Sequence, residues 1–295
     1  SFLVAGLPQN FDRSYRLGQG EHFIVEGDEY DSAFFAKWAK FFYYLPEVLV
    51  VNNIEFDHAD IYRDLGEITK AFRQLVNLVP ENGLILANGA DPNIAPLLPD
   101  APAPVQTFGL EEDAFWRATD LEPGAQGTRF TLQRQGVALG TFDLPLSGEY
   151  NIRNALASLA AANHVGLSPQ QLRPALKRFA GVKRRQERVG QIDDILLIDD
   201  FAHHPTAVSQ TLAGLKQAHP QRRLLAIFEP ASATNARALF EDRYSEAFAL
   251  AEVVVVAPVP RPERARDDEP FSPERLVQRL STTGKTAYYL PDAEA

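Results

Sequence analysis

The stretch from Val48 to Ala87 decides the fold class, and it reads VLVVNNIEFDHADIYRDLGEITKAFRQLVNLVPENGLILA. Its two ends, Val48–Asn52 and Leu84–Ala87, contain short apolar runs, which are typical of buried strands. Between them, the apolar residues of Asp64–Val79 recur about every 3.6 positions, which indicates an amphipathic helix. The apolar face of this helix consists of Leu65, Ile68, Phe72, Leu75, Val76 and Val79. A strand, a helix and another strand predict a parallel sheet covered by helices.

The same alternation continues through the rest of the chain. Asn151–His164 is rich in alanine and predicts a helix, and Ser168–Gln171 predicts the start of another one with a capping box. Thr128–Leu132 and Val137–Leu144 are predicted to pair as an antiparallel hairpin that turns near Gln135-Gly136. Further strands are predicted at Phe23–Glu26, Ile195–Asp200, Leu224–Phe228, Val253–Ala257 and Ala287–Leu290. We therefore predict an α/β fold with mostly parallel sheets.

Length and composition predict two domains. The chain has 295 residues, of which 45% are hydrophobic and 23% are charged, an ordinary balance for globular domains. A short link rich in glycine and basic residues, Gly181–Arg185, separates a predicted helix from a new series of strands and helices. The predicted domains are residues 1–182 and residues 183–295.

The charge of the chain excludes two classes of partner. The net charge is −10 and the pI is about 5.1. An acidic chain has no overall field that attracts nucleic acid or an anionic membrane, although a local basic site for phosphate is compatible with it. No apolar run approaches the ~20 residues that a membrane helix needs. The longest run, Val253–Val259, is interpreted as one buried strand.

The chain contains neither cysteine nor methionine. The lack of cysteine excludes disulfides and thiolate metal sites and fits a cytoplasmic protein, and no signal peptide is recognised. A natural chain of this size should contain several methionines. We therefore expect a fragment, or a sequence from which methionines and disordered segments have been dropped.

Two acidic clusters follow predicted strands. Glu26–Asp31 comes after the strand that ends near Val25, and Asn52–Asp60 comes after Val48–Val51. Loops at the carboxyl ends of parallel strands carry function, and carboxylates crowded at neighbouring strand ends repel each other unless a cation or a proton intervenes. Mg²⁺ suits such a place because it binds few carboxylates and keeps waters and substrate phosphates in its shell. Each cluster is also consistent with acids that are favoured at a helix start.

Two further clusters contain histidine or arginine. Asp199–Pro205 lies between a predicted strand and a predicted helix, and its two Asp and two His residues could bind a metal or position a phosphate and a ribose. The alternative is a strand-to-helix turn with a capping Asp. Lys183–Arg185, with Arg188 close by, suits bidentate phosphate recognition, or is a solvated basic pair. Together the clusters predict a phosphate-handling enzyme with a divalent metal, and a metal-dependent phosphohydrolase is also consistent with them.

Five motifs, in this order and spacing, resemble those of the Mur ligase family. They are Glu26–Asp31 and Asn53–Asp60, similar to the metal-binding segments; Gly148–Ala155, similar to the adenine-contacting G-x-H-N-x-x-N-A; Gly181–Arg185, similar to the Arg pair of the domain link; and Asp199–Pro205, similar to D-D-[YF]-A-H-H-P. Tyr150 stands where the family usually has His. The resemblance implies a central, mostly parallel-sheet ATPase domain followed by a Rossmann-like C-terminal domain.

The resemblance also implies ATP and Mg²⁺ as cofactors. Glu26 and His58 would hold the metal. Several family members carry a carbamylated lysine in the following helix, and Lys70 falls near that place, where a carbamate would bind a second Mg²⁺. Because Lys70 lies opposite the apolar face of its predicted helix, a solvated lysine would also lie there.

The same resemblance assigns residues to the nucleotide and to catalysis. Asn151, Asn154 and Arg185 would hold ATP, and Asp200 and His203 would close over the nucleotide from the C-terminal domain. The residues with an implied catalytic role are His58, Arg185 and His203.

Within the family, the chain resembles murein peptide ligases most. Glu29–Phe35 and Phe56–Ile61 carry this likeness, and Phe228–Pro230 stands where alanine-adding ligases usually have F-Q-P-H. The likeness implies an ADP-forming ligase of peptidoglycan recycling. Its substrates would be UDP-N-acetylmuramate and the murein tripeptide L-alanyl-γ-D-glutamyl-meso-diaminopimelate, joined through an acyl phosphate. The alternative is a UDP-N-acetylmuramate–L-alanine ligase.

Two departures from the family pattern bear on these expectations. The phosphate loop G-x-x-G-K-[ST] and the N-terminal UDP-binding domain are not in this sequence, and a natural protein without the loop would be a degenerate ligase acting as a binding module. Murein peptide ligases also usually continue E-P with R-S-N-T, whereas this chain has Ala231–Thr234. We expect Ser232, Thr234 and Arg237 to bind the peptide, with Arg237 replacing the missing arginine.

Overall fold

The computed structural model describes residues 1–33, 35–59, 61–231, 234–265 and 269–292. By their contacts the residues form two compact units. The first comprises Ser1–Phe56 and Ile61–Asp199, and the second comprises Asp57–Asp60 and Asp200–Ala295. The border after Asp199 differs from the predicted division between residues 182 and 183, because the hairpin at 187–199 groups with the first unit.

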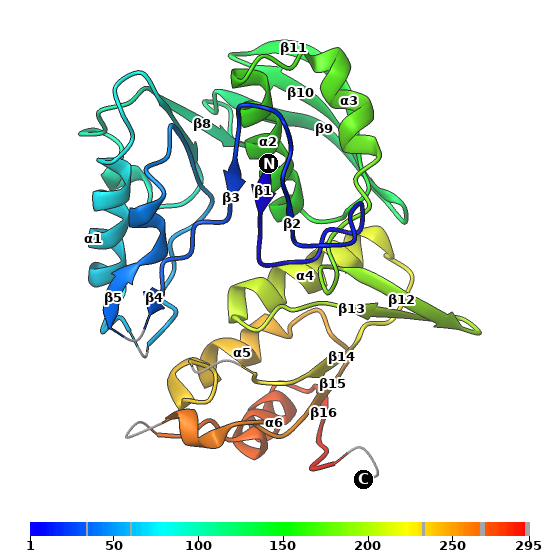
Figure 1. Ribbon diagram of the computed structural model, residues 1–295. Coiled ribbons are helices and arrows are strands. Elements are labelled where there is room, and N and C mark those ends of the chain that lie inside the picture. The colour runs from blue at the N-terminus through cyan, green and yellow to red at the C-terminus, as the bar shows by residue number, and fades with distance from the viewer. Residues whose placement is uncertain (34, 60, 232–233, 266–268, 293–295) are drawn as a thin grey trace. The chain divides into compact units, whose positions relative to one another are not determined.

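A six-stranded sheet forms the centre of the first unit, in the order β11-β10-β9-β8-β7-β6 (Figure 1). Strands β6 to β9 are parallel neighbours, and β9, β10 and β11 are antiparallel. The strands are β6 Val48–Val51, β7 Leu84–Asn88, β8 Val105–Gly109, β9 Trp116–Gly124, β10 Gly127–Arg134 and β11 Val137–Leu144. The predicted parallel pairing of the strands at Val48 and Leu84 is confirmed, and so is the hairpin, whose turn residues Gln135 and Gly136 both have positive φ.

Helices cover both faces of this sheet. Side chains along a strand alternate between the two faces, so one strand contributes to the core on each side. Leu84 and Leu86 of β7 belong to a core with α2 (Glu149–His164), whereas Ile85 and Ala87 belong to a core with α1 (Leu65–Val76). Helix α3 (Pro169–Lys177) packs on β11 and begins with the predicted capping box of Ser168 and Gln171. Short 3-10 helices occur at η1 Lys40–Tyr43 and η2 Ala95–Leu97.

The remaining strands of the first unit form small sheets. Strand β1 (Phe2–Leu3) pairs with β2 (Tyr15–Arg16) and with β3 (Ile24–Val25). Two hairpins are formed by β4 Asp31–Ala33 with β5 Ala36–Ala39, and by β12 Glu187–Ile192 with β13 Ile195–Asp199.

Two expectations about strand pairing are wrong. Ile195–Asp200 was expected to belong to a parallel sheet, but β13 pairs antiparallel with β12, because Asp193 takes a positive φ that turns the chain directly back. The acidic clusters were expected at neighbouring strand ends, but β3 pairs with β1 and β6 pairs with β7. The sheet topology therefore does not place the two acidic clusters side by side, and repulsion between their carboxylates does not follow from it.

The second unit contains a three-stranded parallel sheet in the order β14-β15-β16. Buried aromatic side chains of Phe228, Tyr244, Phe248 and Phe271 pack together beside it. The elements are β14 Leu225–Phe228, β15 Val253–Val256, β16 Thr286–Tyr289, α4 Pro205–Ala218, α5 Glu241–Ala247, α6 Pro273–Thr282, η3 Ala238–Phe240 and η4 Pro262–Ala265. The predicted strands and parallel pairing of this unit are confirmed.

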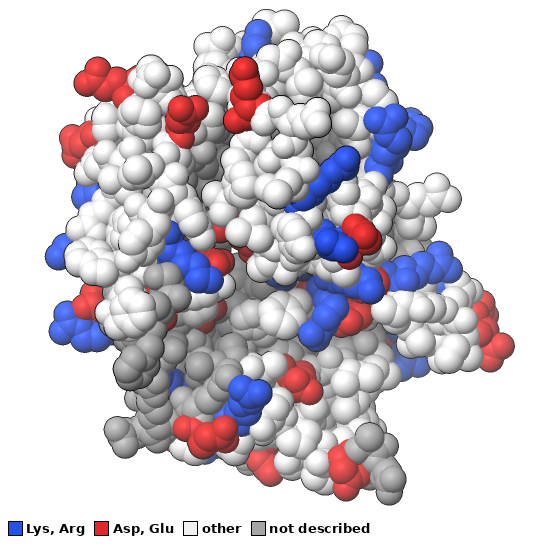
Figure 2. All heavy atoms as spheres, viewed as in Figure 1, with Lys and Arg blue, Asp and Glu red and all other residues white. Residues whose placement is uncertain are grey.

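Acidic and basic side chains of the described residues intermingle on the face shown in Figure 2. Within the described part of the chain, no helix is both long enough and apolar enough to cross a bilayer.

The hairpin side of the first core gives a prediction about stability. Phe130 is fully buried and stacks on Phe142 with ring centroids 6.0 Å apart. Phe130→Ala should lower the free energy of unfolding by about 3–5 kcal/mol, because it removes a buried ring and leaves a cavity. Val137→Ala, at an exposed position of the same hairpin, should change it by less than about 0.5 kcal/mol. Urea unfolding measures both, and equal losses would contradict the assignment of this core.

Candidate functional site

The start of α2 is tied to the link that follows α3. Asn151 is buried, and its Nδ2 donates to the carbonyl oxygen of Ser147 at 2.8 Å. The same oxygen accepts from Gln186 Nε2 at 3.1 Å, and Ser147 N donates to Gln186 Oε1 at 3.3 Å. The structure therefore brings Asn151 close to the segment that carries Arg185, as the expected nucleotide site requires.

Strained backbone surrounds Arg185. Arg184 and Gln186 both have positive φ, at 57° and 49°, which is uncommon outside glycine. Arg184 Nε lies 3.3 Å from Asp199 Oδ2, and its backbone N–H donates to Glu187 Oε2 at 2.8 Å. The side chain of Arg185 is exposed. Strain of this kind concentrates at functional sites, so it supports a role for this link without identifying its ligand.

Asn154 lies one helical turn after Asn151, and it is exposed. Between them, Arg153 bridges two carboxylates, with Nη2 at 3.2 Å from Glu111 Oε1 and Nη1 at 3.2 Å from Glu149 Oε2. Burial raises the pKa of Glu111, but hydrogen bonds from its own backbone and from Arg153 lower the pKa by more than burial raises it. The net pKa is therefore below its usual value. The second turn of α2 thus presents Asn154 beside the ion pairs of Arg153.

Glu26 directly follows β3 and is exposed. Its Oε2 accepts from the backbone N–H of Ala5 at 2.7 Å, which holds the carboxylate at the end of β1. The following loop is held by Tyr62, whose hydroxyl donates to the carbonyl oxygen of Glu29. Burial, together with nearby carboxylates, raises the pKa of Tyr62 to about 12, so this donor stays protonated. Lys70 is exposed on α1.

In the second unit, the loop after β14 contacts the segment Asp57–Ala59. Thr234 is 1% exposed, and its Oγ1 donates to Asp57 Oδ1 at 2.7 Å and accepts from Ala59 N at 3.3 Å. Arg237 Nη1 donates to the carbonyl oxygen of Ala59 at 3.0 Å. His58 has a positive φ of 52°, and its N–H donates to Asp57 Oδ1 at 2.7 Å. Ser232, which was expected to bind the peptide, lies outside the described residues.

His203 is fixed mainly through its backbone. Its carbonyl oxygen accepts from Asn235 Nδ2 at 2.7 Å and from the hydroxyl of Tyr244, while its ring Nδ1 lies 2.9 Å from the carbonyl oxygen of Phe201. Asp200 Oδ1 accepts from Ala202 N at 2.8 Å, as expected for a capping Asp in this turn. Burial raises the pKa of Tyr244 far above its usual value, so its hydroxyl remains a donor.

The structure brings the expected residues together in two groups. Asn151, Asn154 and the Arg185 link form one group in the first unit, where Glu26 and Lys70 also lie. His58, Asp200, His203, Thr234 and Arg237 belong to the second unit. Among the described residues, no three His, Asp or Glu side chains converge in the manner of a metal centre.

The sequence was compared with known protein families. Residues 5–162 match the Mur ligase middle domain, and residues 184–295 match the Mur ligase, glutamate ligase domain. The chain belongs to the Mur ligase family.

Individual Mur ligases differ in the acceptor that they are named for. The chain is 35% identical over 277 residues to a UDP-N-acetylmuramate–L-alanine ligase of Desulfitobacterium hafniense, covering 94% of this chain and 60% of that protein. It is 38% identical over 254 residues to a UDP-N-acetylmuramate–L-alanyl-gamma-D-glutamyl-meso-2,6-diaminoheptandioate ligase of Escherichia coli, covering 86% and 55%. The chain thus spans somewhat more than half the length of these relatives.

A crystal structure supports the fold of this Mur ligase chain. The UDP-N-acetylmuramate–alanine ligase of Thermotoga maritima superposes with a TM-score of 0.75, covering 98% of this chain and 60% of that one, at 22% identity. The α/β fold with mostly parallel sheets is therefore the fold of the Mur ligase middle and C-terminal domains.

Sequence reasoning assigned no role to several residues that hold the expected site residues in place. Asp57 accepts from the N–H of His58, and Gln186 donates to the same carbonyl oxygen of Ser147 as Asn151. Asn235 and Tyr244 both donate to the carbonyl oxygen of His203. Gln186 directly follows the Arg pair, which could have drawn attention to it. Asp57 lies within the Asn53–Asp60 motif, whereas Asn235 and Tyr244 carry no local signal, because their partner His203 is 32 and 41 positions away.

The environment of Asp57 gives a prediction about pH. Burial raises its pKa, but hydrogen bonds from Thr234 and from the N–H of His58 outweigh burial, and the net pKa lies below its usual value. The ionised carboxylate therefore stabilises the fold above about pH 4, the unfolded value, and this contribution is lost as the pH falls through the folded pKa. Thr234→Val should cost about 1.5–3 kcal/mol at pH 7 and less at pH 3.

Urea unfolding at the two pH values measures this effect, and a carboxyl NMR titration should show a higher pKa for Asp57 in the variant. Thr286→Val is the matched control, because Thr286 is exposed on β16 of the same unit. An equal loss at pH 7 and pH 3 would show that Thr234 contributes packing rather than a bond to the carboxylate.

Proposed function

We propose that the full-length protein is an ATP-dependent, ADP-forming ligase that joins UDP-N-acetylmuramate to the murein tripeptide. One observation carries this proposal: the middle and C-terminal Mur ligase domains follow each other in this chain and contain all five motifs in order. Both relatives reported above are named for ligation to UDP-N-acetylmuramate. The proposed process is the reuse of cell-wall peptides in the cytoplasm.

The residues of the first unit are proposed to bind ATP. Asn151 uses its amide nitrogen on Ser147, so its amide oxygen remains able to accept a hydrogen bond from an adenine amine. Asn154 offers a second amide on the next turn. Arg185 is exposed, and its guanidinium suits bidentate binding of phosphate oxygens. Asp200 and His203 are proposed to contact the nucleotide from the C-terminal domain.

The family resemblance, rather than the donor chemistry alone, supports Glu26 and His58 as the proposed Mg²⁺ ligands, because Mg²⁺ prefers oxygen to imidazole nitrogen. Glu26 supplies a carboxylate with one oxygen bound to Ala5 N, and His58 supplies an imidazole on a strained turn. Mg²⁺ is usually bound through one or two carboxylates, such as that of Glu26, with waters and phosphates completing its shell. When bound, it neutralises the charge of the phosphates. Lys70 remains a prediction as a carbamate ligand.

The proposed reaction has two steps. An oxygen of the muramate carboxylate attacks the γ-phosphorus, the bond from that phosphorus to the bridging oxygen of ADP breaks, and an acyl phosphate forms. The amine of the acceptor then attacks the acyl carbon, the carbon–oxygen bond to phosphate breaks, and the amine loses a proton. Arg185 holds the phosphate oxygens, whose charge spreads in the transition state, and the loop Thr234–Arg237 faces the acceptor.

The loop after β14 favours the tripeptide as acceptor. The chain has Phe228-Glu229-Pro230 there, as in the murein peptide ligases that it resembles. A tripeptide carries several carboxylates, so its site should offer cations or several donors, and Arg237 is a cation in this loop. The longer match to the L-alanine ligase of Desulfitobacterium hafniense favours free L-alanine as the second candidate.

A competition assay with full-length protein distinguishes the two acceptors. We expect kcat/KM for the tripeptide to exceed that for L-alanine. Arg237→Ala should lower kcat/KM for the tripeptide by about tenfold or more, and that for alanine by less, because only the tripeptide carries the additional carboxylates. A preference of the wild type for alanine would exclude the murein peptide ligase assignment and leave the Mur family intact. Equal losses for both acceptors would show that Arg237 holds the carbonyl oxygen of Ala59 and does not select the acceptor.

The metal assignment is tested by Glu26→Gln and His58→Ala. Each should lower turnover by about 10²-fold or more, because an interaction made in the transition state is lost. Glu122→Gln and His164→Ala, at exposed positions of the first unit, are the matched controls and should retain full turnover. Steady-state rates over a Mg²⁺ titration, with thermal unfolding to verify folding, measure this. Near-normal rates of both variants at limiting Mg²⁺ would remove these residues from the metal site.

A further inference from the structure

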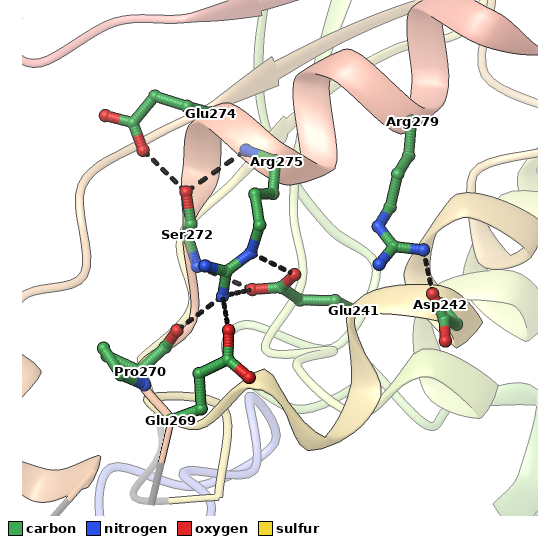
Figure 3. A network of polar contacts seen from close by, with 8 residues as sticks. All are labelled: Glu241, Asp242, Glu269, Pro270, Ser272, Glu274, Arg275 and Arg279. Carbon is green, nitrogen blue, oxygen red and sulfur yellow. Dashed lines mark hydrogen bonds and ion pairs between the residues drawn. The ribbon is translucent and has the colours of Figure 1, made fainter.

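A buried carboxylate organises the segment that follows residue 268. The side chain of Glu241, the first residue of α5, is only 4% exposed. Its oxygens accept from Arg275 Nε at 2.9 Å, from Arg275 Nη2 at 2.8 Å and from Ser272 N at 2.7 Å (Figure 3). A buried charge requires partners of this quality, because an unpaired buried carboxylate is costly. Glu241 is therefore fully committed to the start of α6.

Arg275 extends this contact to the chain just before α6. Its Nη2 also donates to the carbonyl oxygen of Pro270 at 2.8 Å and lies 3.2 Å from Glu269 Oε1 (Figure 3). One guanidinium thus holds Glu241 and the segment Glu269–Pro270 together. A guanidinium has five N–H donors in a planar fork, and an ammonium lacks that geometry.

The segment 269–271 is in turn bonded to the backbone of the loop after β14. Ala238 N donates to the carbonyl oxygen of Glu269 at 2.8 Å, and Phe271 N donates to the carbonyl oxygen of Ala236 at 2.9 Å. Arg237 and Pro270 form a β-bridge between these two bonds. The residues on both sides of Arg237 are therefore positioned by the segment that Arg275 holds.

A neighbouring ion pair on the same two helices lacks these connections. Arg279 of α6 pairs with Asp242 of α5, one residue after Glu241 (Figure 3). The side chain of Asp242 is 81% exposed. The hydrogen bonds to Ser272 and Pro270 come from Glu241 and Arg275 instead. The two pairs therefore join the same helices, but only the buried one reaches the loop.

We propose that Glu241 and Arg275 are positioning residues that set the place of Thr234 and Arg237 for the amine acceptor. This proposal rests on the proposed function, because it assumes that the loop faces the acceptor. The pair acts through the two backbone hydrogen bonds on either side of Arg237. The other contacts of the pair run to Ser272, Pro270 and Glu269.

The experiment compares Arg275→Gln and Arg275→Lys with the control Arg279→Gln, all in full-length protein. Arg275→Gln should raise KM for the amine acceptor about tenfold, since a small displacement of a positioning group has effects of this size or larger. KM for ATP should change less than KM for the acceptor, because Arg275 reaches His203 only indirectly, through the loop that contains Asn235. Arg275→Lys should recover part of the loss, and Arg279→Gln should behave as the wild type in both constants.

Amide hydrogen exchange provides a readout that does not depend on catalysis. In Arg275→Gln, exchange should become faster at Ala238 and Phe271, whereas amides of β15 should stay protected, and Arg279→Gln should leave all of them unchanged. Unchanged exchange at Ala238 and Phe271 would overturn the proposal. So would a lower melting temperature with an unchanged acceptor KM, because the pair would then serve stability alone.

Failure of the proposed function gives a different pattern. If the wild type ligates neither the tripeptide nor L-alanine, the proposed function fails, and with it the assignment of the loop to an amine acceptor. If the wild type is active and Arg275→Gln raises KM for ATP as much as KM for the acceptor, the proposed function stands and the positioning role is wrong.

Discussion

Strand β7 of the first unit has no face exposed to solvent, and the arrangement of the site depends on this constraint. Leu84 and Leu86 of β7 pack in the core with α2, and Ile85 and Ala87 pack in the core with α1. A strand covered on both faces cannot present functional side chains along its length. Chemistry is therefore confined to strand ends, helix starts and links, where the expected residues of this chain lie.

Loops in these places need hydrogen-bond partners that hold their backbone in position. Two carbonyl oxygens serve as such partners. The oxygen of Ser147 accepts from Asn151 and Gln186, and the oxygen of His203 accepts from Asn235 and Tyr244. A carbonyl oxygen has two lone pairs, so each is saturated by side chains from two different segments. Each bond contributes only about 1 kcal/mol, but together they hold backbone that no helix or sheet holds.

The sequence predicted the parts of the fold that follow from periodicity. The β6–α1–β7 unit, the hairpin around Gln135-Gly136 and the capping box at Ser168 all depend on residues close together in the chain. The pairing of β13 could not be predicted, because an apolar run that forms a strand carries no information about its partner strand. The same reason explains the wrong placement of the acidic cluster after β3 beside that after β6.

The candidate site divides in the same way. Motifs nominated His58, Asn151, Arg185 and His203, since each lies in a short run of characteristic residues. The bond from Thr234 to Asp57 joins residues 177 positions apart, and Glu241 meets Arg275 across 34 positions. No local pattern encodes such pairs, because either residue alone is an ordinary polar residue. The positive φ of His58, Arg184 and Gln186 is equally invisible in sequence, since none of them is glycine.

These observations explain why the chain is about equally similar to relatives named for different acceptors. Identity of 35% over 277 residues to one and 38% over 254 residues to the other is an average over the whole match and does not separate the two acceptors. The acceptor would be distinguished by a few residues after β14, which contribute little to an identity counted over more than 250 positions. Under the proposed function, specificity of this kind depends on where Thr234 and Arg237 are held, and the backbone around Arg237 is bonded to the segment 269–271. Residues that never touch the acceptor can therefore take part in choosing it.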